Sequence, residues 1–281
     1  MRTVISLIAP VAGLILTVFA WRAAEAATLT EKFDKTYSVK SNGDVELHNV
    51  NGSVTVEAWD QNHVRVQAEK KVKADDDKAR ELMKQLQIEV TETGGGLRIV
   101  TRMPKRNGGL FDWMSGDDVS VGVEYKIWVP RDAQLDFENT NGKLTVKGIQ
   151  GRAELETTNG GIAVDGAGGE LELGTTNGGI EVTRSAGVLR ANTTNGSIDI
   201  QLDAAPNADQ LSLSTTNGGI ILQVPRNAGM TLDAAATNGR VSSDFEVSGH
   251  AEKRRLEGDV NGGGSRVKLR TTNGSIRIVA G

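Results

Sequence analysis

A four-residue motif, Thr-Thr-Asn-Gly, recurs in the second half of the chain and limits the possible folds more than any other feature. Full copies stand at Thr157–Gly160, Thr175–Gly178, Thr193–Gly196, Thr215–Gly218 and Thr271–Gly274. Related sequences stand at Asn49–Gly52, Asn139–Gly142 and Ala236–Gly239. The asparagines at 141, 159, 177 and 195 are each 18 residues apart, and the later intervals are longer. A fixed period of roughly 20 residues is typical of repeat architectures.

Apolar and polar residues alternate on both sides of each repeat asparagine. The apolar positions lie four and six residues before the asparagine and three and five residues after it, as in Leu171/Leu173 and Ile180/Val182 around Asn177. Only the pair Val241/Ser243 departs from this pattern. Alternation of this kind is the period of a strand with one buried face. Each unit is therefore predicted to be a strand, an Asn-Gly turn, a second strand and a second turn.

Two all-β folds are compatible with this pattern. An Asn-Gly pair between alternating apolar runs is a strong hairpin signal and would favour an antiparallel meander or sandwich. A meander, however, needs a cover for its apolar face, and the chain offers one helical segment. In a β-solenoid the two arms of each coil cover each other, and identical residues stack on their own copies at about 4.8 Å. We therefore predict a β-solenoid with coils of about 18–22 residues.

The first 27 residues are predicted to be a secretory signal peptide. Arg2 precedes an apolar run from Val4 to Ala20, and Ala24-Glu25-Ala26 has the small-x-small pattern of a cleavage site. The alternative is an uncleaved membrane anchor. We expect an exported protein, periplasmic or at the cell surface, and the absence of cysteine means that no disulfide stabilises it.

Residues 28–281 are predicted to form a single elongated β-repeat domain. In residues 28–134, strands surround one helix near residues 73–87, which begins with Asp75-Asp76-Asp77 and has Leu82, Met83 and Leu86 as its apolar stripe. A long loop follows at residues 102–118. Residues 135–281 hold the regular repeats. The last repeat, which ends at Gly281, is predicted to leave an open strand edge, so we expect a monomer or an end-to-end dimer.

Few residues suggest chemistry. His48, His63 and His250 lie on different repeats and lack metal-ligand spacing. The turn Asp165–Gly169 resembles a fragment of a calcium-binding β-roll, but it does not recur at the period that such a roll needs. The sequence suggests no cofactor, and the formal net charge of −4 without a basic patch argues against nucleic acid.

Two repeated side-chain types invite a functional interpretation. Acidic residues recur at outward positions of the arms, and paired carboxylates could serve a glycosidase; a solvated charged face is the commoner explanation. They are Glu154, Glu156, Glu170, Glu172 and Glu181. The first threonine of each motif shares its parity with the core, so we expect its hydroxyl to bond along the stack inside the molecule, which argues against an ice-binding surface.

The loop at residues 102–118 contains the most unusual local sequence. Phe111, Trp113 and Met114 bring large apolar side chains together in a chain with only 4% aromatic residues. They are candidate contacts for a protein or membrane partner. The alternative is that the loop folds back and caps one end of the solenoid.

The chain resembles a bacterial family of unknown function that is labelled "putative adhesins". The resemblance rests on Asn49–Ser53 followed by Glu57–Asp60, on Tyr125–Pro130, on the Thr-Thr-Asn-Gly repeats and on Asn273–Ile276. It implies an exported β-solenoid and brings no catalytic motif. We therefore expect a non-enzymatic binding or scaffold protein of the cell envelope, with a polysaccharide or an envelope protein as its partner. The alternative is a polysaccharide-acting β-helix enzyme.

Overall fold

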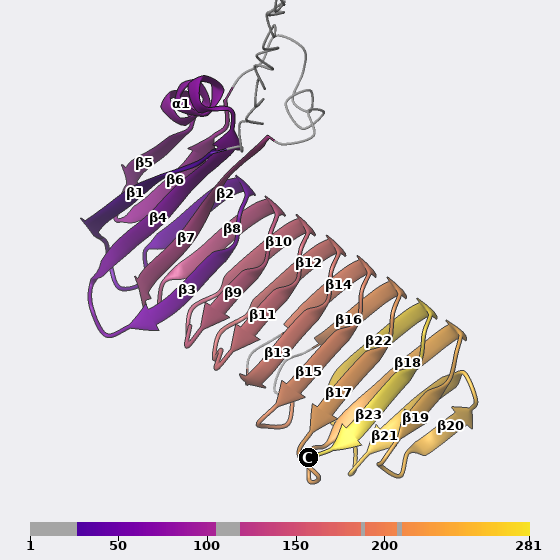
Figure 1. Cartoon of the computed structure of the whole chain (residues 1–281). Helices are drawn as coiled ribbons and strands as arrows, with labels where there is room; N and C mark the ends of the chain where they lie inside the picture. Colours follow the sequence, from indigo (N-terminus) through magenta and orange to yellow (C-terminus); the bar gives the residue numbers. More distant parts are fainter. Residues whose placement is uncertain (1–26, 105–118, 187–188, 207–209) are drawn as a thin grey trace, which may run out of the picture.

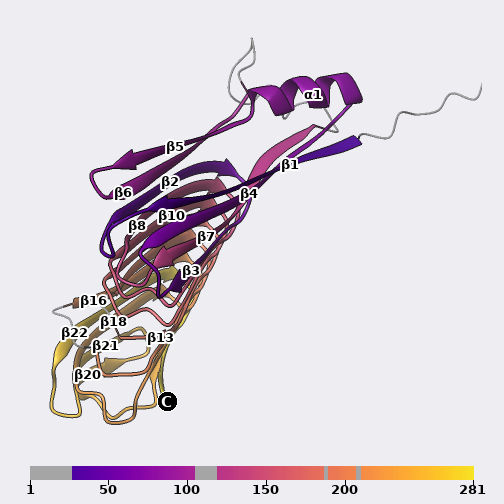
Figure 2. The same ribbon diagram turned by 90° about the vertical axis from the view of Figure 1, so that its left-hand side faces the viewer.

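The computed structural model describes residues 27–104, 119–186, 189–206 and 210–281. These residues form two long β-sheets that face each other, and one short helix (Figures 1 and 2). Phe111, Trp113 and Met114, the candidate partner contacts, lie outside the described residues. In the described ranges, no helix combines the length and the apolar character that a membrane span requires.

The first sheet, sheet A, has 11 strands. In chain order they are β1 (Ala27–Ser38), β3 (Val54–Trp59), β4 (His63–Ala74), β7 (Ser120–Pro130), β9 (Leu144–Lys147), β11 (Ile162–Asp165), β13 (Ile180–Ser185), β15 (Ile198–Leu202), β17 (Ile220–Val224), β19 (Val241–Ser243) and β23 (Ile276–Ala280).

The second sheet, sheet B, has 12 strands. In chain order they are β2 (Asp44–Asn51), β5 (Gln87–Thr93), β6 (Gly96–Arg102), β8 (Gln134–Asn141), β10 (Ala153–Asn159), β12 (Leu171–Asn177), β14 (Leu189–Asn195), β16 (Gln210–Asn217), β18 (Met230–Asn238), β20 (Ser248–Glu252), β21 (Arg255–Val260) and β22 (Ser265–Asn273).

The predicted β-solenoid is confirmed. Each Asn-Gly corner joins a strand of sheet B to a strand of sheet A, and equivalent strands of neighbouring coils pair in parallel, with Thr157 opposite Thr175 and Thr175 opposite Thr193. The Asn-Gly pair is thus not a hairpin turn, as it would be in a meander. The apolar positions of both arms are buried in one continuous core between the sheets, as Leu173 and Ile180 illustrate with 1% exposure each.

The N-terminal end of the stack is built from antiparallel strands. β1 pairs with β4 and β4 with β7 at the edge of sheet A, while the hairpin β5–β6 extends sheet B. Helix α1 (Asp76–Gln85) packs on β4 and β1, with Ala79 and Met83 buried. The predicted helix is confirmed, but it begins at Asp76 because β4 continues as a strand through Ala74.

The C-terminal end differs from our expectation. The last coil does not form the open end of the stack, because β22 lies between β16 and β18, and β23 lies between β17 and β19. The backbone N–H of Gly274 donates to the carbonyl of Asn238, at 3.1 Å, and that of Gly218 to the carbonyl of Asn273, at 2.9 Å. The prediction of an open edge at Gly281 was therefore wrong.

The hairpin β20–β21 covers the end instead. It extends sheet B beyond β18, and its turn reaches over to sheet A, where Val241 N–H donates to the carbonyl of Lys253 at 3.0 Å. The outermost strand of sheet B at this end is therefore β20, and its residues are exposed.

Candidate functional site

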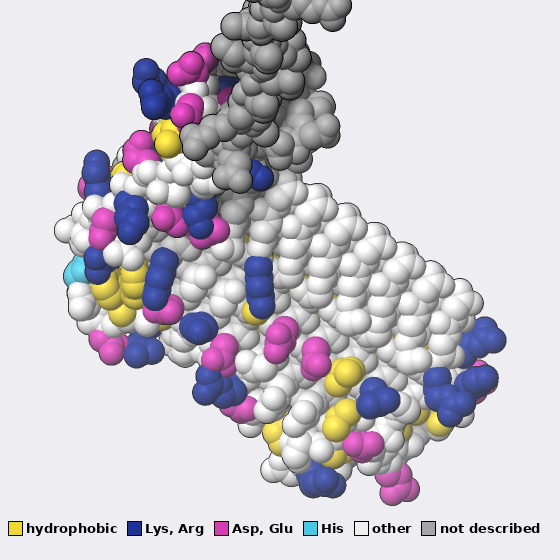
Figure 3. All heavy atoms as spheres, viewed as in Figure 1, with side chains coloured by type: hydrophobic (Ala, Val, Ile, Leu, Met, Phe, Trp, Pro, Cys, Tyr) yellow, Lys and Arg dark blue, Asp and Glu magenta, His cyan; other side chains and the backbone are white. Residues whose placement is uncertain are grey.

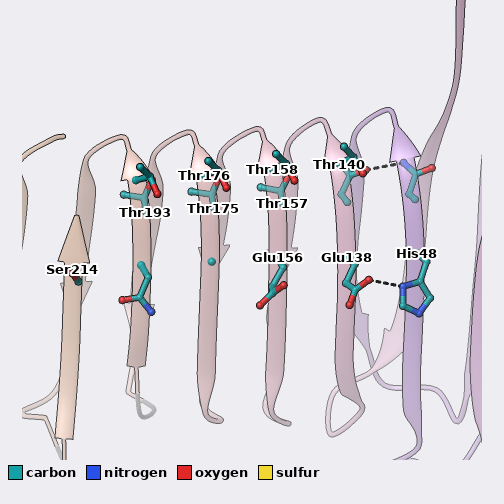
Figure 4. A pocket seen from close by; sticks show the side chains of 15 residues that line it. His48, Glu138, Thr140, Glu156, Thr157, Thr158, Thr175, Thr176, Thr193 and Ser214 are labelled. Atoms are coloured by element: carbon teal, nitrogen blue, oxygen red, sulfur yellow. Dashed lines mark hydrogen bonds and ion pairs between the residues drawn. The ribbon is translucent and has the colours of Figure 1, made fainter. Parts of the chain in front are cut away.

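A groove of about 570 Å³ crosses β2, β8, β10, β12, β14 and β16 on the outer face of sheet B. Each of these strands sends alternate side chains outward. One outward row lies directly before the repeat asparagines, and we call it the hydroxyl row: Thr140, Thr158, Thr176 and Thr194. A second outward row lies two residues earlier: His48, Glu138, Glu156, Gly174, Asn192 and Ser214. Figure 4 shows both rows running side by side across the strands.

Two ladders of hydrogen bonds hold the floor and the rim of the groove in place. Beneath it, the buried Thr175 hydroxyl donates to the carbonyl of Gly160 at 2.9 Å, and the equivalent threonine of each neighbouring coil does the same. At the rim, Asn177 Nδ2 donates to Oδ1 of Asn159 at 2.8 Å. The expectation that the first threonine of each motif bonds along the stack is confirmed.

The first two coils of the groove replace the buried threonine by asparagine. Asn49 Nδ2 lies 3.2 Å from Asn139 Oδ1, and the Thr101 hydroxyl donates to Asn49 Oδ1 at 2.9 Å. The same hydroxyl lies 2.7 Å from the hydroxyl of Tyr125, which is buried between the sheets. These four polar side chains form one chain of hydrogen bonds that holds this end of the groove in place.

The charge of the groove changes along its length. At the β2 end, Nδ1 of His48 lies 2.8 Å from Oε2 of Glu138, and Glu156 follows on the next strand. The pKa of Glu156 is raised by partial burial and, to a smaller extent, by the charges of Glu138 and Glu154. Toward β16, the same row holds Gly174, Asn192 and Ser214, which are small and uncharged.

The corner beside the groove carries no charge over several coils. Figure 3 shows a ridge free of coloured side chains along the ends of β10, β12, β14 and β16. It is made of the repeated Thr, Asn and Gly residues, and Lys143 and Arg240 follow the corner glycines of the coils at its two ends. A ligand that lies along the stack therefore meets hydroxyl and amide groups at every coil.

The predicted acidic residues lie on two different faces. Glu154, Glu156 and Glu172 are on the outer face of sheet B and Glu170 directly precedes β12, whereas Glu181 belongs to β13 of sheet A. Arginine side chains balance several of them: Arg152 lies 2.9 Å from Glu154 and 3.3 Å from Glu172, and Arg190 lies 3.0 Å from Glu170. Exposed pairs of this kind contribute little to stability, so they mainly lower the local charge.

The other residues considered in the sequence have structural partners. His63 packs edge-on against Trp59 with ring centroids 4.6 Å apart, and His250 lies 3.0 Å from Glu252. The carboxylate of Asp165 accepts hydrogen bonds from Thr183 and Arg184 of the next coil, and these bonds lower its pKa. Within the residues that the structure describes, no group of three or more His, Asp or Glu is arranged to hold a metal.

A second surface feature lies on the outer face of sheet A. The rings of Trp59 and Trp128 stack with centroids 6.2 Å apart, and the Lys126 ammonium lies 4.7 Å from the centroid of Trp128. The indole N–H of Trp59 donates to the carbonyl of His63 at 2.9 Å. The alternation around Asn51 places Trp59 on the outward face, but only the pairing of β3 with β7 brings Trp128 beside it. Gly174, Asn192 and Ser214 occupy one outward position that varies between repeats, and aligning the repeats on their asparagines identifies it.

Comparisons with known proteins identify the family of this chain. The model of the Toastrack family, DUF4097, matches residues 43–279. A "putative cell adhesion protein" from Clostridium sporogenes is 12% identical with a TM-score of 0.41, and the match covers 90% of this chain and 100% of that one. A "putative adhesin" from Bacteroides fragilis is 13% identical with a TM-score of 0.43, covering 89% and 97%. No curated protein matches the chain. Because the family model spans nearly all of the coils, including those that form the groove, the chain belongs to the Toastrack DUF4097 family.

Proposed function

We propose that this protein is an exported, non-enzymatic binding protein of the cell envelope that holds a linear, uncharged glycan along the groove of sheet B. The observation that carries the proposal is the repetition of the same hydroxyl and amide groups on successive coils of one groove. An extended surface with a regular repeat suits a partner that is itself extended and repetitive. In this proposal residues 28–281 act as one elongated body after the signal peptide is removed.

The chemistry of the two rows supports a glycan. Threonine, serine and asparagine side chains both donate and accept hydrogen bonds, as the hydroxyl groups of sugars require. Gly174 leaves a low point in the middle of the groove, where a sugar ring can approach the sheet closely. The acidic end, with Glu138 and Glu156, disfavours polyanions because like charges repel.

The binding is tested by filling the groove at Gly174. A Cβ atom built at this position meets only the side chain of Glu156, at 3.7 Å, so Gly174→Tyr is expected to fold normally. Binding of neutral linear glycans, measured on a glycan array and by pull-down with insoluble polysaccharides, is expected to weaken about tenfold or more, since about 1.4 kcal/mol corresponds to a factor of ten.

The matched control is Ser212→Tyr. Ser212 is an outward residue of the same sheet, on β16, but it does not line the groove. The control should bind glycans like the unaltered protein. If Gly174→Tyr binds as well as Ser212→Tyr, the groove is not the glycan site.

A second candidate function is hydrolysis of the glycan. It is favoured by one observation: the raised pKa of Glu156 beside Glu138 in the groove, which is the arrangement of a general acid next to a second carboxylate. Release of soluble sugars from a bound polysaccharide, abolished in Glu156→Gln, would establish the enzyme. Stable capture without release supports the binding protein.

A further inference from the structure

Among the residues that the structure describes, β1, the outer strand of sheet A at the N-terminal end, pairs along one edge only and leaves the other edge free. It is the first strand in the order of sheet A and pairs with β4 over its whole length, from Ala27 to Ser38. An unpaired strand edge of this length presents a row of N–H and C=O groups to any chain that can pair with it. Figure 2 shows β1 as a long strand at the end of the stack.

Among the described residues, the acidic side chains of β1 form ion pairs with β4, but its lysines do not. Oε1 of Glu31 lies 2.9 Å from Nζ of Lys70, and Arg65 and Gln67 of β4 both donate to the carboxylate of Asp34. Lys32 and Lys35 are exposed, and among the described residues neither forms an ion pair. The ammonium of Lys35 lies 5.3 Å from the ring centroid of Phe33.

We propose that β1 pairs with β1 of a second copy of this chain, antiparallel and centred on Phe33, so that sheet A continues across a two-fold axis. In this register Lys32 lies opposite Asp34 of the second copy, and Lys35 lies opposite Glu31. Leu29 lies opposite Tyr37, and Thr30 lies opposite Thr36. Both unpaired lysines thus gain a carboxylate, and each contact occurs twice by symmetry.

The alternation of side chains restricts the possible registers. Leu29, Phe33 and Tyr37 pack toward the core side of sheet A, so the odd-numbered residues share one face. Residues directly opposite in an antiparallel pair point to the same face, which leaves only registers centred on a single residue. Centring on Glu31, Lys32, Asp34 or Lys35 would place that charge against its own copy. Near the middle of β1, Phe33 is the centre that avoids this repulsion.

The dimer would present two binding surfaces in one direction. The two-fold axis runs perpendicular to sheet A, so it keeps the outer faces of both copies of sheet B on the same side. Two grooves on one side allow simultaneous attachment to a single surface, which raises the overall affinity without new contacts. The pairing itself rests on β1 alone and does not depend on what the groove binds.

The first test is the mass of the full chain in solution, measured by light scattering over a range of concentrations. We expect a concentration-dependent dimer. Lys35→Glu turns two attractions into two repulsions and should weaken dimerisation about tenfold or more. Adding Glu31→Lys and Lys70→Glu to Lys35→Glu restores opposite charges across the two-fold axis and keeps residues 31 and 70 oppositely charged, so it should restore the dimer. Lys253→Glu, the same charge change at the far end of the stack, is the control and should leave the mass unchanged.

The second test uses the absence of cysteine from the chain. Phe33→Cys places the only thiol of each copy opposite its counterpart, so a short bifunctional thiol reagent should link two chains. Ala251→Cys, on the exposed edge strand β20, should not be linked. A monomer at every concentration, or linkage of Phe33→Cys no faster than that of Ala251→Cys, overturns the proposal and assigns Lys32 and Lys35 to protecting the edge. Because no glycan is present in either test, this failure leaves the proposed function untouched.

Discussion

Asn177 donates a hydrogen bond from its side-chain nitrogen to the side-chain oxygen of Asn159, 2.8 Å away on the preceding coil. The same bond recurs along the whole stack in its spatial order, through Asn51, Asn141, Asn159, Asn177, Asn195, Asn217, Asn273 and Asn238. At the N-terminal end, Asn51 Nδ2 donates to the carbonyl of Val121 at 3.0 Å. The ladder fixes the register of neighbouring coils at the corner that borders the groove.

Interrupting this ladder in its middle should cost more than interrupting it at its end. Asn177→Ala removes two side-chain hydrogen bonds, whereas Asn238→Ala removes one, since Asn238 is the last member. A net hydrogen bond contributes about 1 kcal/mol, and less where the side chains are exposed. We expect a loss of about 1–2 kcal/mol for Asn177→Ala and about half of that for Asn238→Ala. Urea unfolding measures both losses, and the slope of the free energy of unfolding against urea concentration should stay unchanged. Equal losses of stability in the two variants would show that the number of side-chain hydrogen bonds removed does not determine the loss.

The two threonines of one motif should respond differently to the same substitution. Thr175 is 8% exposed and donates to the carbonyl of Gly160, whereas its neighbour Thr176 points outward into the groove. Valine keeps the shape but removes the hydroxyl. Thr175→Val should destabilise the protein by about 1–2 kcal/mol, because the half-buried carbonyl of Gly160 loses this donor. Thr176→Val should stay within about 0.5 kcal/mol and instead weaken glycan binding. A stability loss shared equally by both variants would contradict the buried role of Thr175.

The corner glycines allow neighbouring coils to stack closely, because a side chain at these positions would meet the backbone of the adjacent coil. A Cβ atom at Gly178 would lie 2.0 Å from the carbonyl oxygen of Gly160, which belongs to the backbone of the adjacent coil. Gly178→Ala therefore forces neighbouring coils apart, and we expect a loss of about 3 kcal/mol or more, at the upper end of overpacking. Gly174→Ala, where the nearest atom is 3.7 Å away, should be nearly neutral. Thermal unfolding of the two variants compares them, and similar midpoints would contradict the close approach at the corner.

Tyr125 should make the protein sensitive to alkaline pH. Burial raises the pKa of Tyr125 to about 12, and the hydrogen bond to Thr101 offsets this slightly. Because an unfolded tyrosine titrates near pH 10, the folded state holds the proton more tightly. This contribution to stability is complete below about pH 10 and is lost as the pH rises through about 12.

Tyr125→Phe removes the titrating group, so stability should fall less steeply with pH in that window. The second tyrosine, Tyr37, provides the control. Its pKa is also raised, by partial burial and by the charge of Glu92, but it lies near the edge of the stack. Ultraviolet titration of Tyr125→Phe should show only the lower of the two transitions. If the higher transition persists in Tyr125→Phe, it belongs to Tyr37.

The sequence alone determined the local structure of the coils. Alternation around each repeat asparagine identified the buried positions, such as Leu173 and Ile180, and the parity of Thr175 placed its hydroxyl inside. These predictions succeeded because strand periodicity and corner geometry depend on a few neighbouring residues. The positions of opposite parity on the same strands point outward into the groove and include Gly174, so that part of the site was also present in the sequence.

Only the tertiary structure decided the order of the coils. All the coils carry nearly the same rows of Val, Leu, Ile, Thr and Asn, so any coil could pair in register with any other. The last coil lies between two earlier ones because the hairpin β20–β21 occupies the outer edge of β18 and leaves its inner edge for β22. The stacking of Trp59 on Trp128 and the free edge of β1 likewise depend on strands far apart in sequence, which local patterns do not bring together.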